Sequence, residues 1–404
     1  MIFLLIAIAV FNKLVYRSLL NPVFLQSVVW FVYYLLITLN IASYDVYLVN
    51  INQFVLFQSL GFSIGGFICT LFSRTATVYD RQQVSAVDIN KAFANIRLFY
   101  PFVLLIILSA IAFIGMESGS LSIFSIMDFR DALSEDDGKK VGAIGTLQLL
   151  VSIYVIVYIS IIVKNQEKWY KPVLLISAFV YFTLLLGSKG QFVYFFCAAA
   201  YMVIWQKKIN KTYLVISIVG FLAILGLLFF LRAGGQSDSI TEDSANDLML
   251  IYTVTALPAL YLSQVAAPKI FGYYTFRIFY VWLNKLGFDF PVAPVLSEWI
   301  VTPLPTNVYS YIMPYYRDFG YTGVFIMPLI LGFIHNFIYF RANRGNFVFL
   351  VLNSLMIYAI ITQVWEENYF RQITNWAYIL IVILILTKVN FTSKKVTEFQ
   401  PAAL

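Results

Sequence analysis

Long apolar runs separated by short polar connections dominate the pattern of hydrophobic and polar positions along the chain. A helix needs about 20 mostly apolar residues to cross a bilayer. Eleven runs approach this length and predict membrane-spanning helices: residues 1–12, 23–42, 53–72, 98–115, 142–163, 172–187, 190–206, 212–231, 321–340, 346–364 and 373–389. The first run has no charge ahead of it, so we expect a short span there and not a cleaved signal peptide.

Two connections are much longer than the others. The first, residues 116–141, is acidic, and the second covers the 89 residues 232–320. Within the second, residues 249–265 are apolar but contain Pro258, which favours an interfacial or re-entrant segment over a full span. Residues 269–288 predict an amphipathic helix that lies against the membrane or the helix bundle. One narrow polar stripe on that helix holds Lys269, Tyr273, Arg277, Tyr280 and Asn284.

The composition agrees with a membrane protein. Hydrophobic residues make up 61% of the 404 residues and charged residues only 12%, and the mean hydropathy is +0.82. The chain is therefore expected to be an all-α polytopic integral membrane protein. We divide it into an N-terminal bundle of eight spans (1–231), a large outer loop with interfacial helices (232–320), and three C-terminal spans with a cytoplasmic tail (321–404).

The distribution of charge predicts the orientation. If the C-terminus lies inside, the inner connections hold 17 of the 27 Lys and Arg residues but only 4 of the 20 Asp and Glu residues. Short cytoplasmic loops carry such an excess of cations, so the N-terminus is expected outside and both long connections face outward. The net charge of +7 is thus a signal of topology, and no nucleic-acid partner is expected.

Few residues suggest metal or cofactor chemistry. Cys69 and Cys197 lie inside apolar runs and are expected to be small packing residues without a disulfide. The acidic stretch at 134–138 resembles a solvated loop more than a metal site. The single histidine, His335, falls toward the cytoplasmic end of its span, where packing or hydrogen bonding is expected. No phosphate-binding loop, dinucleotide fingerprint or Ser/His/Asp set is present, so we expect no cofactor.

Polar chemistry gathers instead near the outer interface. The cations placed there are Lys189, Arg232, Arg277 and Arg317. Arginine suits phosphate through its planar donors, and tyrosine rings suit sugars, so together they indicate a lipid diphosphate that carries saccharide. Two simpler readings stay open: the tyrosines belong to an interfacial aromatic belt, and Arg317 pairs locally with Asp318.

The stretch "NVYSYIMPYYRDFGYTGVF" (307–325) has an N-x-Y-[ST]-Y and D-F-G-x-x-G pattern leading into a late span. Together with "LLLGSKGQF" around Lys189 and the large outer loop, it resembles the oligosaccharide repeat-unit polymerases, the Wzy-type O-antigen polymerases. The resemblance implies a glycosyltransferase of lipopolysaccharide-type polysaccharide biosynthesis in the bacterial inner membrane, with its active face in the periplasm. It also implies an architecture similar to the GT-C glycosyltransferases and no nucleotide sugar or metal.

The same resemblance implies partners and site residues. The substrate is an undecaprenyl-diphosphate-linked oligosaccharide in the bilayer, and a chain-length regulator and a flippase are possible partners. Arg232, Arg277 and Arg317 become candidates for holding the leaving diphosphate, and Asp318 is the first candidate for general base, with Glu298 and Glu242 as alternatives. The expected substrate-binding residues are Lys189, Tyr273, Asn307, Tyr309 and Tyr311.

Two other functions remain as alternatives. A ligase that moves finished glycan to another lipid would share the fold and the cations. A transporter or flippase of lipid-linked oligosaccharide would need repeated or broken helices in both halves of the chain, and no convincing repeat is present. Charged residues are nearly absent from the predicted spans, which favours an enzyme of the outer face.

Overall fold

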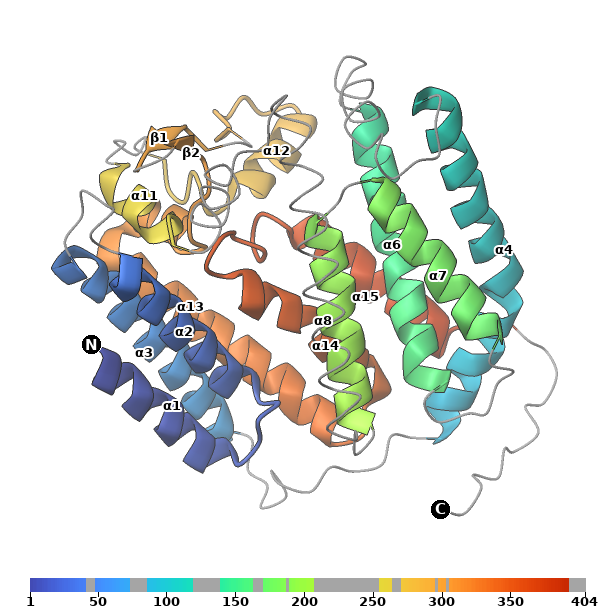
Figure 1. The fold of residues 1–404 in the computed structure, drawn as a ribbon, viewed down its shortest axis with the longest axis horizontal. Coiled ribbons are helices and arrows are strands. Elements are labelled where there is room, and N and C mark those ends of the chain that lie inside the picture. The colour runs from blue at the N-terminus through green and yellow to red at the C-terminus, as the bar shows by residue number, and fades with distance from the viewer. Residues whose placement is uncertain are drawn as a thin grey trace. The chain divides into compact units, whose positions relative to one another are not determined.

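The computed structural model describes ten stretches of the chain: residues 1–40, 48–72, 86–118, 139–162, 170–186, 189–206, 254–263, 270–294, 297–302 and 305–391. Ten helices coincide with ten of the eleven predicted apolar runs (Figure 1). They are α1 (Ile2–Tyr16), α2 (Pro22–Asn40), α3 (Leu48–Phe72), α4 (Ala86–Ser118), α6 (Lys139–Ile162), α7 (Tyr170–Leu185), α8 (Lys189–Gln206), α13 (Met313–Asn343), α14 (Phe347–Thr362) and α15 (Ile373–Lys388). The remaining run, 212–231, lies outside the described residues.

Five of these helices are long and apolar enough to cross a membrane: α2, α3, α4, α6 and α13. The other five are also apolar but give shorter apolar segments. The helical, multi-pass character predicted from the sequence is therefore confirmed, whereas the count of eleven spans stays a prediction. The only strands in the described stretches are β1 (Ile300–Val301) and β2 (Pro305–Thr306), which pair antiparallel with Ile300 opposite Thr306.

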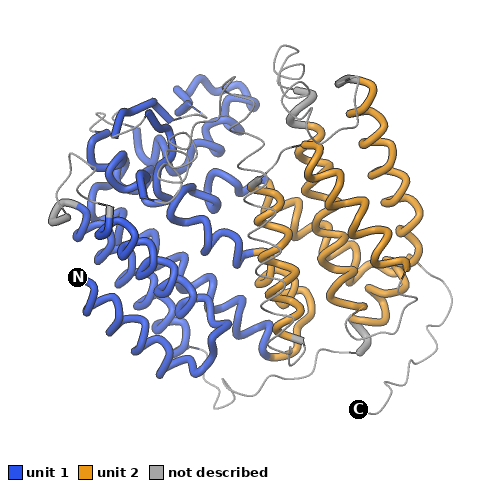
Figure 2. Tube along the Cα trace, in the orientation of Figure 1, with its two compact units in different colours: residues 1–81, 241–343, 356–374 blue, residues 82–240, 344–355, 375–404 orange. Residues whose placement is uncertain are grey.

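Contacts divide the chain into two compact units that alternate along the sequence (Figure 2). Unit 1 comprises residues 1–81, 241–343 and 356–374, and unit 2 comprises residues 82–240, 344–355 and 375–404. In unit 2, helices α4, α6, α7 and α8 pack on one another. Asn95 of α4 also donates hydrogen bonds to the carbonyls of Leu386 and Val389, at 3.0 and 2.7 Å, and so ties α4 to the end of α15.

The packing of α3 against α13 forms the centre of unit 1. Glycines allow this close approach, because a Cβ on Gly61 or Gly65 would collide with a backbone carbonyl of α13, and one on Gly332 would collide with a carbonyl of α3. Small residues have this role in membrane helix pairs, where close contact replaces the hydrophobic effect as the driving force. Cys69 of α3 and Cys197 in unit 2 are both buried, and neither takes part in a disulfide.

A buried chain of hydrogen bonds fixes the start of α13 within unit 1. Gln58 of α3 accepts from the Gln26 side chain of α2 at 2.7 Å and from the Tyr311 hydroxyl at 3.2 Å. The Tyr311 amide donates to the carbonyl of Gln363 at 2.9 Å, and the Gln363 side chain accepts from the Trp30 indole at 3.0 Å. Buried polar groups that are satisfied in this way specify one arrangement of the helices.

The outer loop departs from the prediction in one respect. The helix expected over residues 269–288 is only α12 (Arg277–Lys285), and residues 270–276 form turns. Gly272 has a φ of +64°, a left-handed conformation that a continuous helix excludes, so Tyr273 does not share a helix face with Arg277, Tyr280 and Asn284. Lys269, the first residue of the predicted stripe, lies outside the described residues. Pro258 lies in α11 (Ala256–Leu262), a short buried helix against α3, which agrees with a segment too short to span.

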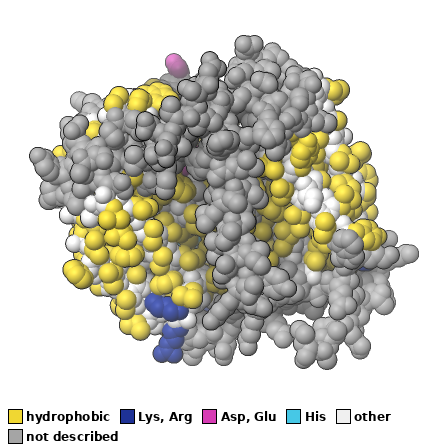
Figure 3. Space-filling model, in the orientation of Figure 1, with side chains coloured by type: hydrophobic (Ala, Val, Ile, Leu, Met, Phe, Trp, Pro, Cys, Tyr) yellow, Lys and Arg dark blue, Asp and Glu magenta, His cyan; other side chains and the backbone are white. Residues whose placement is uncertain are grey.

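The described surface of unit 1 is largely apolar. Phe3, Leu14 and Phe72 are among the large hydrophobic side chains that remain exposed on its helices. In Figure 3, hydrophobic side chains cover most of this surface, and Lys and Arg gather at one end of it. An extended apolar surface with cations at its edge is what a lipid-facing helix bundle presents.

Candidate functional site

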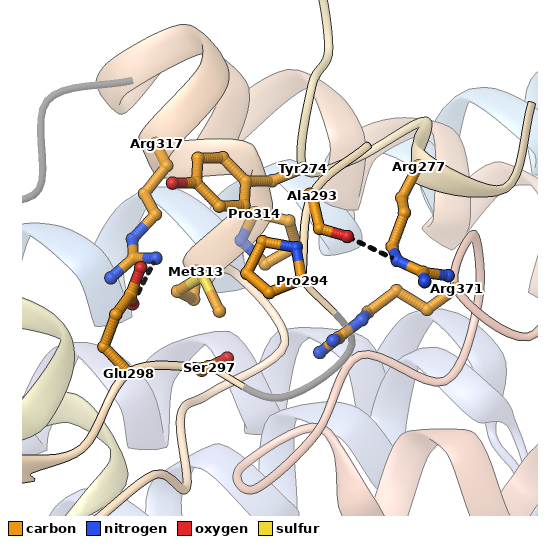
Figure 4. A pocket seen from close by; sticks show the side chains of 10 residues that line it. All are labelled: Tyr274, Arg277, Ala293, Pro294, Ser297, Glu298, Met313, Pro314, Arg317 and Arg371. Carbon is orange, nitrogen blue, oxygen red and sulfur yellow. Dashed lines mark hydrogen bonds and ion pairs between the residues drawn. The ribbon is translucent and has the colours of Figure 1, made fainter. Parts of the chain in front are cut away.

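A pocket in unit 1 lies where four separate pieces of the outer loop and the helix ends meet (Figure 4). These pieces are the turn before α12 together with α12 itself, the loop that leads to β1, the first turn of α13, and the segment between α14 and α15. The lining residues are Tyr274, Arg277, Ala293, Pro294, Ser297, Glu298, Met313, Pro314, Arg317 and Arg371. Three guanidinium groups and one carboxylate give the lining an excess of positive charge.

Arg317 is the most enclosed of the three arginines, with only 3% of its side chain exposed. Its Nη1 donates to Oε2 of Glu298 at 2.9 Å. The guanidinium carbon lies 5.1 Å from the ring centre of Tyr274 and 5.6 Å from that of Tyr309, within the range of cation–π attraction. Its Nε and Nη2 have no hydrogen-bond partner among the described residues, so a buried cation keeps two donors available.

Arg277 and Arg371 form the other side of the pocket in Figure 4. The Nε of Arg277 donates to the carbonyl of Ala293 at 2.7 Å, which fixes the direction of the side chain. Burial lowers the pKa of Arg277, and the nearby charge of Arg371 lowers it further. Arginine nevertheless stays protonated in proteins, so two like charges are held close together, and an anion placed between them would relieve that repulsion.

Asp318, the first candidate for general base, is engaged elsewhere. Both of its carboxylate oxygens accept from the Tyr274 amide at 3.1 Å, and Oδ2 also accepts from the Thr275 amide at 2.7 Å. It does not line the pocket. Its carboxylate instead braces the turn that carries Tyr274 toward Arg317, so we reassign Asp318 from proton transfer to positioning.

Two residues after Asp318, α13 has a break. Gly320 has φ +59° and ψ −150°, a backbone conformation that is essentially restricted to glycine. The break separates a first turn, which carries Arg317, from the longer helical part that packs on α3. The glycine of the D-F-G pattern therefore sets the direction in which Arg317 and Asp318 approach the outer loop.

The predicted sugar-binding residues do not gather in the pocket. Tyr309 is buried with its ring against Arg317, and its hydroxyl donates to the Glu298 carbonyl at 2.9 Å. Burial raises the pKa of this hydroxyl, so it remains a donor. Tyr311 is fully buried and belongs to the core, while Tyr273 packs edge-on against Tyr274. Asn307 is half-buried and does not line the pocket.

Of the four predicted cations, the structure brings Arg277 and Arg317 together. Arg232 lies outside the described residues, as does Glu242. Lys189 begins α8 in unit 2, and its side chain is also outside the described part of the chain.

Arg371 is the site residue that the sequence reasoning missed. It follows a buried acid, Glu367, whose carboxylate accepts from the amides of Tyr369, Phe370 and Arg371 at 2.8 to 3.0 Å. The same carboxylate accepts from the Tyr315 hydroxyl at 2.7 Å, so it ties the Arg371 turn to α13. Burial raises the pKa of Glu367. The sequence did contain a signal for Arg371: it is a cation directly before the apolar run 373–389, on the same predicted side of the membrane as Arg317.

No cluster of three or more potential metal ligands occurs among the residues that the structure places. The arrangement of guanidinium groups is instead suited to phosphate oxygens, which accept several charge-assisted hydrogen bonds from planar donors.

Comparison with known proteins gives a family match in the C-terminal part of the chain. No curated protein and no solved structure matches the chain. Residues 308–396 match the family model described as O-antigen polysaccharide polymerase Wzy. This segment contains Arg317 and Arg371 and runs from the start of α13 to beyond α15. This match confirms the resemblance to Wzy-type polymerases that the motif at 307–325 indicated.

Proposed function

We propose that this protein polymerises undecaprenyl-diphosphate-linked oligosaccharide repeat units at the periplasmic face of the bacterial inner membrane. The observation that carries the proposal is the buried guanidinium of Arg317, which keeps two donors without partners beside two further arginines. An unpaired buried donor costs about 1–3 kcal/mol, so such a group favours an anionic ligand that would complete its hydrogen bonds.

The chemistry follows from where charge develops. A sugar hydroxyl of one repeat unit attacks the anomeric carbon of the other lipid-linked chain, and the carbon–oxygen bond to the lipid diphosphate breaks. Negative charge grows on the departing diphosphate in the transition state. Cations held in place before the reaction stabilise that charge without having to reorganise, which lowers the barrier. Arg277, Arg317 and Arg371 are the residues to which we assign this role.

The test is polymerisation by the purified protein in lipid nanodiscs, with repeat units on undecaprenyl diphosphate isolated from cells that lack this chain. Wild type should give a ladder of products. Arg317→Lys keeps the charge but loses the planar donors, and removal of one such transition-state donor costs about 100- to 1,000-fold in turnover. Arg341→Lys, an exposed arginine at the far end of α13, is the matched control and should retain the ladder.

Other results would identify the alternatives. Transfer of glycan to a lipid without diphosphate would indicate a ligase. Movement of lipid-linked oligosaccharide across the bilayer without new glycosidic bonds would indicate a flippase. Either result, or a full ladder from Arg317→Lys, would contradict the proposed role of the pocket.

A further inference from the structure

Glycosyl transfer to a hydroxyl needs a group that takes the proton of that hydroxyl. A general base must lie within hydrogen-bond reach of its proton, and it must keep an oxygen available for the purpose. Two carboxylates next to the pocket are already saturated. Asp318 accepts backbone amides on both oxygens, and Glu367 accepts three amides and a tyrosine hydroxyl.

Glu298 differs from both of these acids. It lines the pocket, and 42% of its side chain is exposed, so a substrate can reach it. One oxygen, Oε2, accepts from Arg317, and Oε1 accepts no hydrogen bond from the described residues. Figure 4 shows the side chain beside Arg317, across the pocket from Arg277 and Arg371.

The surroundings hold Glu298 in place at two points. The Tyr309 hydroxyl fixes its backbone carbonyl at 2.9 Å, and the Arg317 guanidinium fixes its carboxylate at 2.9 Å. Arg317 is in turn held between the rings of Tyr274 and Tyr309. Arg317 thus orients Glu298, and the two tyrosine rings orient Arg317. A general base is held in this way by a neighbouring group that is itself fixed.

From this geometry we infer that Glu298 is the general base of the transfer, an assignment that rests on the proposed function. Its carboxylate takes the proton of the acceptor hydroxyl as that oxygen bonds to the anomeric carbon. The electron pair of the broken carbon–oxygen bond leaves with the diphosphate, which the arginines hold. The protonated Glu298 then releases its proton to solvent through its exposed side. Glu298 is therefore assigned to the acceptor hydroxyl, and Arg277, Arg317 and Arg371 are assigned to the leaving diphosphate.

The test compares Glu298→Gln with wild type in the nanodisc assay, under single-turnover conditions. The amide keeps the size and one acceptor oxygen but takes no proton. Proton transfer by a positioned group contributes about 100- to 10,000-fold to the rate, so turnover should fall within that range. Binding of inorganic pyrophosphate should persist, because Glu298→Gln leaves the three arginines of the pocket in place. Asp289→Asn, an exposed acid in the same loop, should behave as wild type.

A second variant separates chemistry from structure. Glu298→Ala should be inactive and should regain turnover when formate is added, because a small carboxylate can occupy the vacated space and accept the proton. Asp318→Ala should not respond to formate. Full turnover of Glu298→Gln, or an inactive Glu298→Ala that formate does not rescue, would overturn the assignment. A wild-type protein that makes no polymer in the same assay would contradict the proposed function instead.

Discussion

The site is built from a few side chains that each restrain another. Arg317 orients Glu298, two tyrosine rings restrain Arg317, and Asp318 holds the turn that carries one of these rings. The sequence predicted Arg277 and Arg317 as site residues, because it gives their type and because the distribution of Lys and Arg predicts their side of the membrane. It could not predict which tyrosines are buried, because the burial of Tyr309 and Tyr311 depends on residues far away in the sequence.

The contribution of Arg371 can be measured by substitution. Arg371→Gln should weaken the binding of inorganic pyrophosphate by about 10- to 100-fold, because a hydrogen bond to a charged group contributes about 1.5–3 kcal/mol. Isothermal titration of the protein in nanodiscs would measure the change. Arg341→Gln removes the same charge outside the pocket and serves as the control. Equal affinities of the two variants would remove Arg371 from the anion site.

Asp318 should affect stability more directly than chemistry. Asp318→Ala leaves the amides of Tyr274 and Thr275 without an acceptor, which should cost about 1–3 kcal/mol and lower the melting temperature. Asp318→Asn keeps one acceptor oxygen and should lie between the alanine variant and wild type. Thermal unfolding in detergent, with Asp289→Ala as an exposed control, would measure this. An unchanged melting temperature would show that the carboxylate does not brace the turn.

The positions of the individual helices were predicted better than any other feature of this protein. Ten of the eleven apolar runs coincide with helices, because the apolar length that a bilayer requires is written directly in the sequence. The helix predicted over 269–288 was wrong in length, since the left-handed conformation of Gly272 outweighs the amphipathic pattern. The break at Gly320 falls directly before residue 321, where the sequence predicted the span to begin, whereas the helical stretch ahead of it was predicted as loop.

The break in α13 gives a test of its own. Gly320→Ala introduces a Cβ into open space, so its cost comes from the backbone conformation and should be about 1–3 kcal/mol. The variant should melt at a lower temperature and lose polymerase activity, because the turn that carries Arg317 changes direction. Gly145→Ala in α6 also meets open space but has helical geometry, and it should be neutral or stabilising. Similar behaviour of the two alanine variants would show that the break is not required.

At the scale of the whole molecule, the cation count predicts which face carries the chemistry, and that face stays a prediction. The cation count placed the outer loop and the segment before α15 on one side, and the structure brings Arg277, Arg317 and Arg371 into one pocket. The division into two units could not be predicted from the sequence, because each unit is assembled from stretches that are far apart in the chain.

Cysteine labelling tests this sidedness. The part of α13 after its break at Gly320 runs to Asn343, and a helix of about 23 residues is roughly 35 Å long, more than the bilayer core of about 30 Å. With Cys69 and Cys197 replaced by alanine, Ser297→Cys should react with a membrane-impermeant maleimide on intact spheroplasts. Arg341→Cys should react only after the membrane is opened. Labelling of Arg341→Cys alone on intact spheroplasts would reverse the proposed orientation.

The hydrogen bonds of Gln363 and Glu367 have a consequence for synthesis of the protein. Gln363 and Glu367 hold Tyr311 and Tyr315 in place, and Arg371 completes the pocket, yet all three are translated only after α14. A nascent chain that has inserted its earlier helices still lacks the groups that complete its anion site. The segment between α14 and α15 must therefore be made and folded before the proposed anion site exists.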